Sequence, residues 1–134
     1  MKNLSSGINN SLTILVGEND SARHLGSGLL DVYSTPAMIA LMERTSMEMI
    51  QPLLDDGYGT VGVSVNIKHI RATPVGAKVR CNSLLHEVAG NRLVFKVEAW
   101  DDNGMIGEGI HERYIIDETR FLNKLKKPDD NPVR

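Results

Sequence analysis

The sequence predicts an α+β domain in which one long helix packs against an antiparallel sheet, and three observations lead to this. Ser-Thr-Pro at residues 34–36 is a typical helix start, and apolar residues then recur at helical spacing to about residue 54. Between residues 60 and 116, apolar and polar side chains alternate in four segments, as in half-buried strands. Short turn sequences separate those segments, and short turns join neighbouring antiparallel strands.

Composition points to a single soluble domain. The chain has 134 residues, of which 41% are hydrophobic and 24% charged, which is enough for one core. The net charge of −2 argues against nucleic-acid binding. The lone Cys81 cannot form an internal disulfide and falls on the apolar side of a predicted strand, so we expect a buried thiol in a reducing compartment. With neither a signal segment nor a membrane-length apolar run, we expect a cytoplasmic protein without membrane association.

The predicted elements follow in order with clear boundaries. We expect a short edge strand at 12–16, an irregular loop at 18–34, the long helix at 35–54, strands at 60–71, 78–88, 92–100 and 105–116, and a closing helix at 118–127. The sequence Asp-Asp-Asn-Gly between the last two strands is a strong hairpin signal. The tail from about residue 128, with its prolines and charges, is expected to be disordered.

The long helix has two apolar sectors when its residues are spaced about 100° apart. The sector expected to face the sheet contains Met38, Leu41, Met42, Thr45, Met49, Pro52 and Leu53. Ile39, Met47 and Ile50 form the second sector, and Glu43 lies within it. Two interpretations of that carboxylate stay open: it pairs with a basic residue at the margin of the sector, or the sector packs on a partner subunit and Glu43 lines a pocket there.

The first long strand raises a question about its final inward residue. Val61, Val63, Val65 and Ile67 share one predicted side, and His69 comes next on that side. A core histidine bonded to a carbonyl would explain this position, and so would a functional imidazole. Thr35 would by itself be the N-cap of the helix.

Three segments together resemble a known family. The helix begins TPAMIALME at Thr35, the strand ends KHIRATPVG from Lys68, and the last strand contains GEGIHERYII from Gly107. Their order and spacing are similar to those of the fluoroacetyl-CoA thioesterases of the hot-dog superfamily, over about residues 23–127. The resemblance implies the hot-dog fold, with a long central helix wrapped by a curved antiparallel sheet. It also implies a homodimer, with a tetramer as a further option.

The resemblance assigns roles to particular residues. Thr35, Glu43 and His69 match the catalytic positions, while Gly62, His69 and Arg113 match positions that contact the substrate. His69 would be the general acid/base, since imidazole titrates near neutrality. Glu43 would be either a nucleophile or the base that positions water, and Thr35 would hydrogen-bond Glu43 or the water. No metal and no cofactor are expected, because coenzyme A enters as part of the substrate.

Hydrolysis of an acyl-CoA is therefore the expected activity, with two rivals. A non-catalytic acyl-CoA sensor would use the same groove for binding alone, and a hot-dog hydratase would need an Asp/His pair in a helix motif that this sequence lacks. Between Arg23 and Thr35 the chain is several residues shorter than the fluoroacetyl-CoA enzyme, in the segment that builds an aromatic lid there. We therefore expect a more general acyl-CoA thioesterase.

Overall fold

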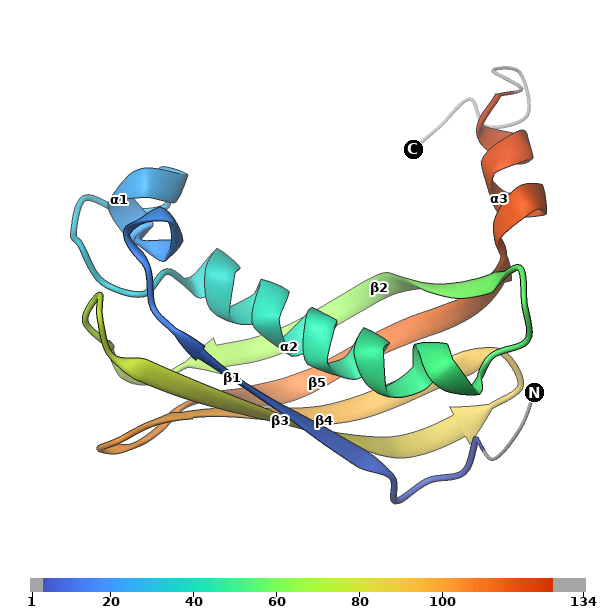
Figure 1. The fold of residues 1–134 in the computed structure, drawn as a ribbon, viewed down its shortest axis with the longest axis horizontal. Coiled ribbons are helices and arrows are strands. Elements are labelled where there is room, and N and C mark those ends of the chain that lie inside the picture. Colours follow the sequence, from blue (N-terminus) through green and yellow to red (C-terminus); the bar gives the residue numbers. More distant parts are fainter. Residues whose placement is uncertain (1–3, 127–134) are drawn as a thin grey trace.

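The computed structural model describes residues 4–126, in which one helix crosses a curved sheet (Figure 1). Its strands are β1 (Asn9–Leu15), β2 (Tyr58–His69), β3 (Lys78–Ala89), β4 (Arg92–Asp101) and β5 (Gly104–Asp117). Its helices are α1 (Ala22–Leu25), α2 (Thr35–Ile50) and α3 (Glu118–Leu125), with 3-10 turns η1 (Glu18–Asp20) and η2 (Gln51–Leu53). The predicted α+β class is confirmed. The predicted disordered tail lies outside the described residues.

The strand order places two different strands at the edges of the sheet. Within residues 4–126 the sheet has five strands in the order β1-β3-β4-β5-β2, and each neighbouring pair is antiparallel. The predicted meander of four consecutive strands is confirmed for β3, β4 and β5 but is wrong for β2, which pairs with β5 rather than with β3. The edge position predicted for the first strand is confirmed for β1. Strand β2 pairs with β5, so its other edge faces away from the sheet.

Helix α2 buries a wider arc than predicted. Met38, Leu41, Met42, Thr45 and Met49 are buried as expected. Ile50 was assigned to the second sector but is 0% exposed, because the curved sheet covers more of the helix circumference than one stripe. Pro52 is exposed, contrary to the prediction, because the α-helix ends at Ile50 and η2 no longer follows the helical spacing.

Strand β2 does not keep the alternation predicted for it. Its register against β5 shifts between Gly62 and Ser64, which inserts one extra residue and reverses the sides of the residues that follow. Val63 and Val65 are 51% and 45% exposed, so the prediction that they point into a core is wrong. His69 lies opposite Gly107 at the far end of the strand pair.

The segment that leads into α2 is more ordered than predicted. Helix α1 lies within the stretch expected to be irregular, capped by Ser21, whose side chain accepts from the His24 N–H. The N-cap of α2 is Ser34, whose hydroxyl accepts from the Ala37 N–H at 3.1 Å. Thr35 is therefore the first residue of the helix, and the prediction that it is the N-cap is wrong. Capping by Ser34 leaves the Thr35 hydroxyl available for another contact.

Cys81 is fully buried in the core, as predicted. Burial raises the pKa of its thiol to about 11. A thiol with so little thiolate near neutral pH is a structural residue.

Candidate active site

One part of the candidate site lies where the start of α2 meets the end of β2. The Thr35 hydroxyl and Nδ1 of His69 are hydrogen-bonded at 2.8 Å. Both residues lie in the wall of an open pocket of about 330 Å³, which the segment preceding α2 also lines. The predicted pair is thus brought together by two elements that lie far apart in sequence.

The second ring nitrogen of His69 is the unusual feature of this pair. Nε2 is buried and has no hydrogen-bond partner within residues 4–126. The ring also contacts Tyr33 edge-on, with centroids 6.5 Å apart. Burial lowers the pKa of His69, opposed by the backbone of Arg71, so the imidazole is neutral near pH 7. A neutral ring with one unpartnered nitrogen differs from the core histidine that the strand pattern also allowed, because its Nδ1 meets a hydroxyl rather than a carbonyl.

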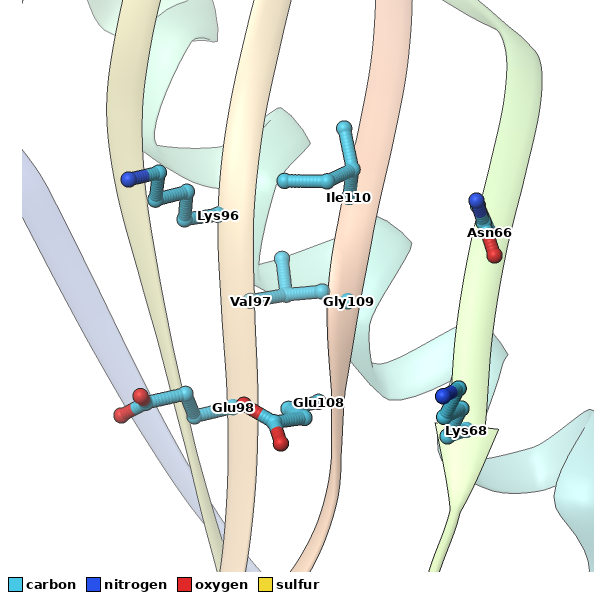
Figure 2. Close-up of a pocket in the computed structure, with 8 residues that line it drawn as sticks. All are labelled: Asn66, Lys68, Lys96, Val97, Glu98, Glu108, Gly109 and Ile110. Carbon is cyan, nitrogen blue, oxygen red and sulfur yellow. The ribbon is translucent and has the colours of Figure 1, made fainter.

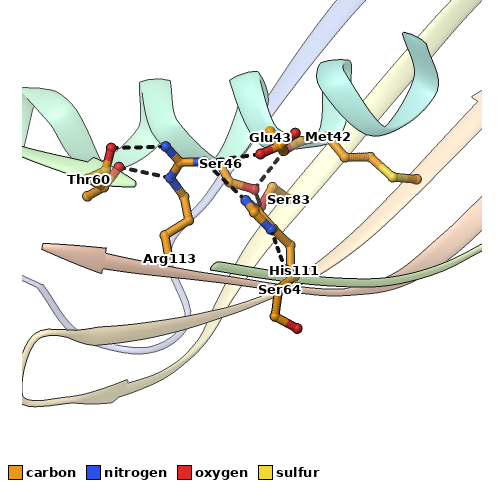
Figure 3. Close-up of polar contacts among 8 residues, drawn as sticks. All are labelled: Met42, Glu43, Ser46, Thr60, Ser64, Ser83, His111 and Arg113. Carbon is orange, nitrogen blue, oxygen red and sulfur yellow. Dashed lines mark hydrogen bonds and ion pairs between the residues drawn. The ribbon is translucent and has the colours of Figure 1, made fainter. Parts of the chain in front are cut away.

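The other part of the site lies farther along α2, over β2 and β5 (Figure 3). Glu43 Oε2 is 3.8 Å from Nη1 of Arg113, and the two side chains are 41% and 9% exposed. Arg113 also donates from Nε to Thr60 Oγ1 at 2.8 Å and from Nη2 to the Thr60 carbonyl at 3.1 Å. Burial lowers the pKa of Arg113 and Glu43 opposes this, so the guanidinium remains charged. Glu43 is therefore paired with a basic residue, as one of its two interpretations held.

Gly62 lies directly beneath the Glu43 carboxylate. A Cβ at this position would be 2.7 Å from Glu43 Oε2 and 3.3 Å from Nη1 of Arg113. The missing side chain is what lets the carboxylate approach the strand. Gly62 also faces Arg113 in the strand pairing, so three of the predicted site residues meet here.

Arg113, which the resemblance places among the positions that contact the substrate, has little exposure to solvent. The residue is 7% exposed, and its guanidinium points under α2 toward Glu43. A phosphate in solvent would have to displace the contacts to Thr60 in order to reach it. Arg113 therefore lies beside the Glu43 carboxylate, at the inner wall of the site.

One chain does not bring all the predicted catalytic residues together. Glu43 is eight residues beyond Thr35 on α2, which is about 12 Å along the helix axis. Thr35 meets His69 at one place, and Glu43 meets Gly62 and Arg113 at the other. The structure thus contains two half-sites rather than a triad.

Sequence reasoning missed three residues that build these half-sites. Ser34 caps α2 and Tyr33 contacts the His69 ring edge-on, so both lie beside the Thr35 and His69 pair. The serine could have been found, because Ser34 lies three residues before the N–H that it caps. His111 is fully buried beside Arg113, but the sequence analysis gave it no role beyond a place in the HER motif. Two inward residues on one strand, His111 and Arg113, were the available signal.

A second hollow lies on the face of the sheet opposite α2 (Figure 2). It has a volume of about 430 Å³ and is lined by Asn66, Lys68, Lys96, Val97, Glu98, Glu108, Gly109 and Ile110. Its lysines and glutamates are of mixed sign, and none of the predicted site residues lines it. Within residues 4–126, no cluster of three or more His, Cys, Asp or Glu could hold a metal, and no helix is long and apolar enough to cross a membrane.

Comparisons with known proteins bear on what these half-sites are. The family model for fluoroacetyl-CoA-specific thioesterases matches residues 16–119. A fluoroacetyl-CoA thioesterase from Streptantibioticus cattleyicolor is 35% identical over 97 residues, which is 72% of this chain and 70% of that protein.

Solved structures agree with the sequence relationship. A fluoroacetyl-CoA thioesterase structure has a TM-score of 0.90 at 30% identity, covering 94% of this chain and 98% of that one. A mutant of such an enzyme, solved with fluoroacetate and CoA, has a TM-score of 0.84 at 31% identity, covering 88% and 99%. A Thermus thermophilus member of the thioesterase superfamily has a TM-score of 0.88 at 25% identity, covering 97% and 96%. The chain therefore belongs to the fluoroacetyl-CoA-specific thioesterase family and has the hot-dog fold.

Proposed function

We propose that this acyl-CoA thioesterase hydrolyses its substrate at a composite site between two copies of the chain. Thr35 and His69 of one subunit would face Glu43 and Gly62 of the other. The observation that carries the proposal is the pairing of Thr35 with His69 while Nε2 of that ring has no partner within residues 4–126. Glu43, about 12 Å away on the same helix, is too distant to act on the same carbonyl carbon within one chain.

The free edge of β2 supports a homodimer. Within residues 4–126 the outer edge of β2 has no neighbouring strand, and Val63 and Val65 on this strand are 51% and 45% exposed. Such an edge is suited to pairing with a second copy. If two β2 strands pair antiparallel about a two-fold axis between Val65 and Asn66, Gly62 of one lies opposite His69 of the other. The burial of Ile50 removes part of the apolar helix sector that first suggested a dimer, so the strand edge is the stronger support. A further pairing of dimers into a tetramer would double the mass measured in sedimentation.

The chemistry begins at the carbonyl carbon of the thioester. In one route Glu43 takes a proton from water, whose oxygen forms the new bond to that carbon. In the other route the Glu43 carboxylate attacks the carbon itself and forms an anhydride, which water then hydrolyses. In both routes the C–S bond breaks, and neutral His69 relays through Nε2 to the departing thiolate one proton of the water that is consumed. The Glu43 carboxylate is restored, and the products are a free acid and CoA.

The remaining residues orient these groups. The Thr35 contact to Nδ1 fixes the His69 ring so that Nε2 faces the substrate. Arg113 holds the Glu43 carboxylate in place through their ion pair, and the backbone N–H of Gly62 is our candidate for binding the carbonyl oxygen. The proposal needs no metal or cofactor. A cytoplasmic location is part of it, supported by the single, buried Cys81.

We propose that the enzyme accepts acyl-CoA substrates with different acyl groups. The loop before α2 presents Leu29 and Leu30, which are 85% and 66% exposed. These aliphatic side chains stand in the segment that we expect to be shorter than in the fluoroacetyl-CoA enzyme, which builds an aromatic lid there. We therefore propose a general acyl-CoA substrate class rather than fluoroacetyl-CoA alone.

A panel of acyl-CoAs from acetyl to palmitoyl tests the function, with thiol release followed by a chromogenic reagent. Wild type should release thiol from at least one member. Glu43→Gln should still bind that member in calorimetry, while kcat falls by at least about 100-fold, and His69→Ala should lower kcat by about 10²–10⁴-fold. The rival function, an acyl-CoA sensor, predicts binding by wild type with no thiol release from any chain length.

Glu48→Gln is the matched control for the glutamate variant. Glu48 lies on the same helix but is paired with Arg44 at 2.8 Å on the exposed side. Neutralising it should leave kcat within about twofold of wild type, because surface pairs of this kind contribute little. Equal losses in the Glu43 and Glu48 variants would contradict a catalytic role for Glu43.

A further inference from the structure

His111 is a buried titratable group that the proposed mechanism does not use. It is 0% exposed and lies on β5 opposite Val65 of β2 and Phe95 of β4. Its ring stacks on Phe95 with centroids 6.0 Å apart and an interplanar angle of 27°. An imidazole in such a place costs free energy unless both of its nitrogens are satisfied.

The two contacts of the ring fix its protonation. Nδ1 is 2.9 Å from the Ser64 carbonyl oxygen, which can only accept, so Nδ1 carries a proton. Nε2 is 3.2 Å from Nη1 of Arg113, which can only donate, so Nε2 presents its lone pair. Figure 3 shows both contacts, and together they make the ring neutral and fix one tautomer. Burial, aided by Arg113, lowers the pKa of His111 and favours the same neutral form.

The bulge in β2 prepares this arrangement. Ser64 is the residue at which the register with β5 resumes after the shift at Gly62. A bulge interrupts the ladder locally, so a backbone carbonyl there can turn to a side-chain donor. The bulge also separates Gly62, which lies under Glu43, from the paired residues 64–69 of the strand.

Nη1 of Arg113 faces two groups. It donates to His111 at 3.2 Å and lies 3.8 Å from Glu43 Oε2. The three side chains converge over Gly62, where an added Cβ would be 3.3 Å from Cε1 of His111 and 3.3 Å from Nη1 of Arg113. Thr60 holds the other two nitrogens of the guanidinium, Nε and Nη2. Nη1 is held by the uncharged His111 ring and faces the charged Glu43 carboxylate.

We propose that His111 is a positioning residue: its neutral Nε2 accepts from Arg113 and so fixes the guanidinium nitrogen that faces the Glu43 carboxylate. The proposal rests on the catalytic role proposed for Glu43. It adds a residue to the half-site, so that β5 supplies both Arg113 and the residue that orients it. His111 itself does not touch the substrate.

The tautomer can be observed directly. In long-range ¹⁵N–¹H correlation spectra of the wild-type protein near pH 7, the His111 ring should show a protonated Nδ1 and an unprotonated Nε2. A protonated Nε2 would overturn the proposal, because that atom could then not accept from Arg113. His111→Phe identifies the signals.

Substitution separates positioning from packing. His111→Phe keeps a ring against Phe95 but cannot accept from Arg113, so kcat should fall by about tenfold or more while KM changes less. His111→Gln places an amide oxygen near the position of Nε2 and should recover most of the lost activity. His111→Asn places its polar atoms near Nδ1, toward Ser64, and should not. His86→Phe, at an exposed position on β3, is the control and should match wild type.

A double-mutant cycle gives the decisive comparison. If His111 acts through Arg113, then His111→Phe should lower kcat by less than about twofold when Arg113 has already been replaced by Met. The same loss in both backgrounds, or no loss in His111→Phe alone, would overturn the proposal. If His111→Phe does not fold, equal activity of the Gln and Asn variants would overturn it instead. An unchanged turnover in Glu43→Gln would count against the proposed function, which is a separate outcome.

Discussion

Thr35 and His69 are hydrogen-bonded side chain to side chain at 2.8 Å, although 34 positions separate them in the sequence. The contact exists because Ser34 caps α2 and leaves the next hydroxyl unused. Two neighbouring hydroxyl residues therefore have different tasks: one stabilises the helix and the other orients an imidazole.

The division of labour between these hydroxyls can be tested by removing each in turn. Thr35→Val keeps the shape of an exposed side chain but removes its hydroxyl, so kcat should fall about tenfold or more with an unchanged melting temperature. Ser34→Ala should do the reverse and cost about 1 kcal/mol of stability, the usual loss for an N-cap. Thermal unfolding and thiol release on both variants check this. A larger stability loss in the Thr35 variant than in the Ser34 variant would contradict the assignment.

Gly62→Ala should uncouple activity from stability. The new methyl group would meet the Glu43 carboxylate at 2.7 Å, and that carboxylate is the free end of a flexible side chain. The chain should fold with a nearly unchanged melting temperature, while displacement of Glu43 lowers kcat by about tenfold or more.

Gly109→Ala is the contrasting variant. A Cβ there would overlap the backbone oxygen of Asn66 and approach Cα of Ile67 at 2.8 Å, so the strands themselves would have to move. This variant should lose stability. A Gly62→Ala protein that loses as much stability as Gly109→Ala would show that Gly62 serves the strand rather than the site.

The stability of the protein should fall as the pH is lowered below about 6.5. Burial lowers the pKa of His69 and of His111 from the ordinary value of 6.5. The unfolded chain therefore takes up protons in this window that the folded chain does not, and the free energy of unfolding decreases with decreasing pH. Urea unfolding at about pH 7.5, 6.5 and 5.5 measures this. His111→Phe should show a weaker dependence than wild type, and an identical dependence would argue against a buried neutral His111.

Much of the fold could be predicted from sequence because its signals are local. The Ser-Thr-Pro start of α2 and the turn at 101–104 need no distant contact to be recognised. The bulge at Gly62 could not be recognised, because valines continue at every second position on both sides of it. The N-cap of α2 was misplaced by one residue because Ser34 and Thr35 both carry hydroxyls. Neighbouring hydroxyls are distinguished by backbone angles, which the sequence does not state.

The site was predicted less completely than the fold. Thr35, Glu43, His69, Gly62 and Arg113 were named through resemblance, and each occupies one of the two half-sites. Their division into two groups follows from the length of α2, which the positions of Thr35 and Glu43 already imply. The role of His111 depends on which atoms its two nitrogens meet, and a strand pattern does not contain that information.

The composite site can be tested by complementation between inactive subunits. One chain carries His69→Ala, the other carries Glu43→Gln, and the two are co-expressed with different affinity tags so that the heterodimer can be purified. In the proposed arrangement one of its two sites combines an intact His69 with an intact Glu43. The heterodimer should therefore regain about half of the wild-type rate, although each parent homodimer is inactive.

A second heterodimer serves as the matched control, because the composite site predicts that it is inactive. It pairs a wild-type chain with a chain that carries both substitutions, so that each composite site has lost either His69 or Glu43. This heterodimer should be inactive in thiol release, while the first regains about half of the wild-type rate. The opposite result, an inactive first heterodimer and a half-active second one, would contradict the central claim and place His69 and Glu43 of one chain in one site.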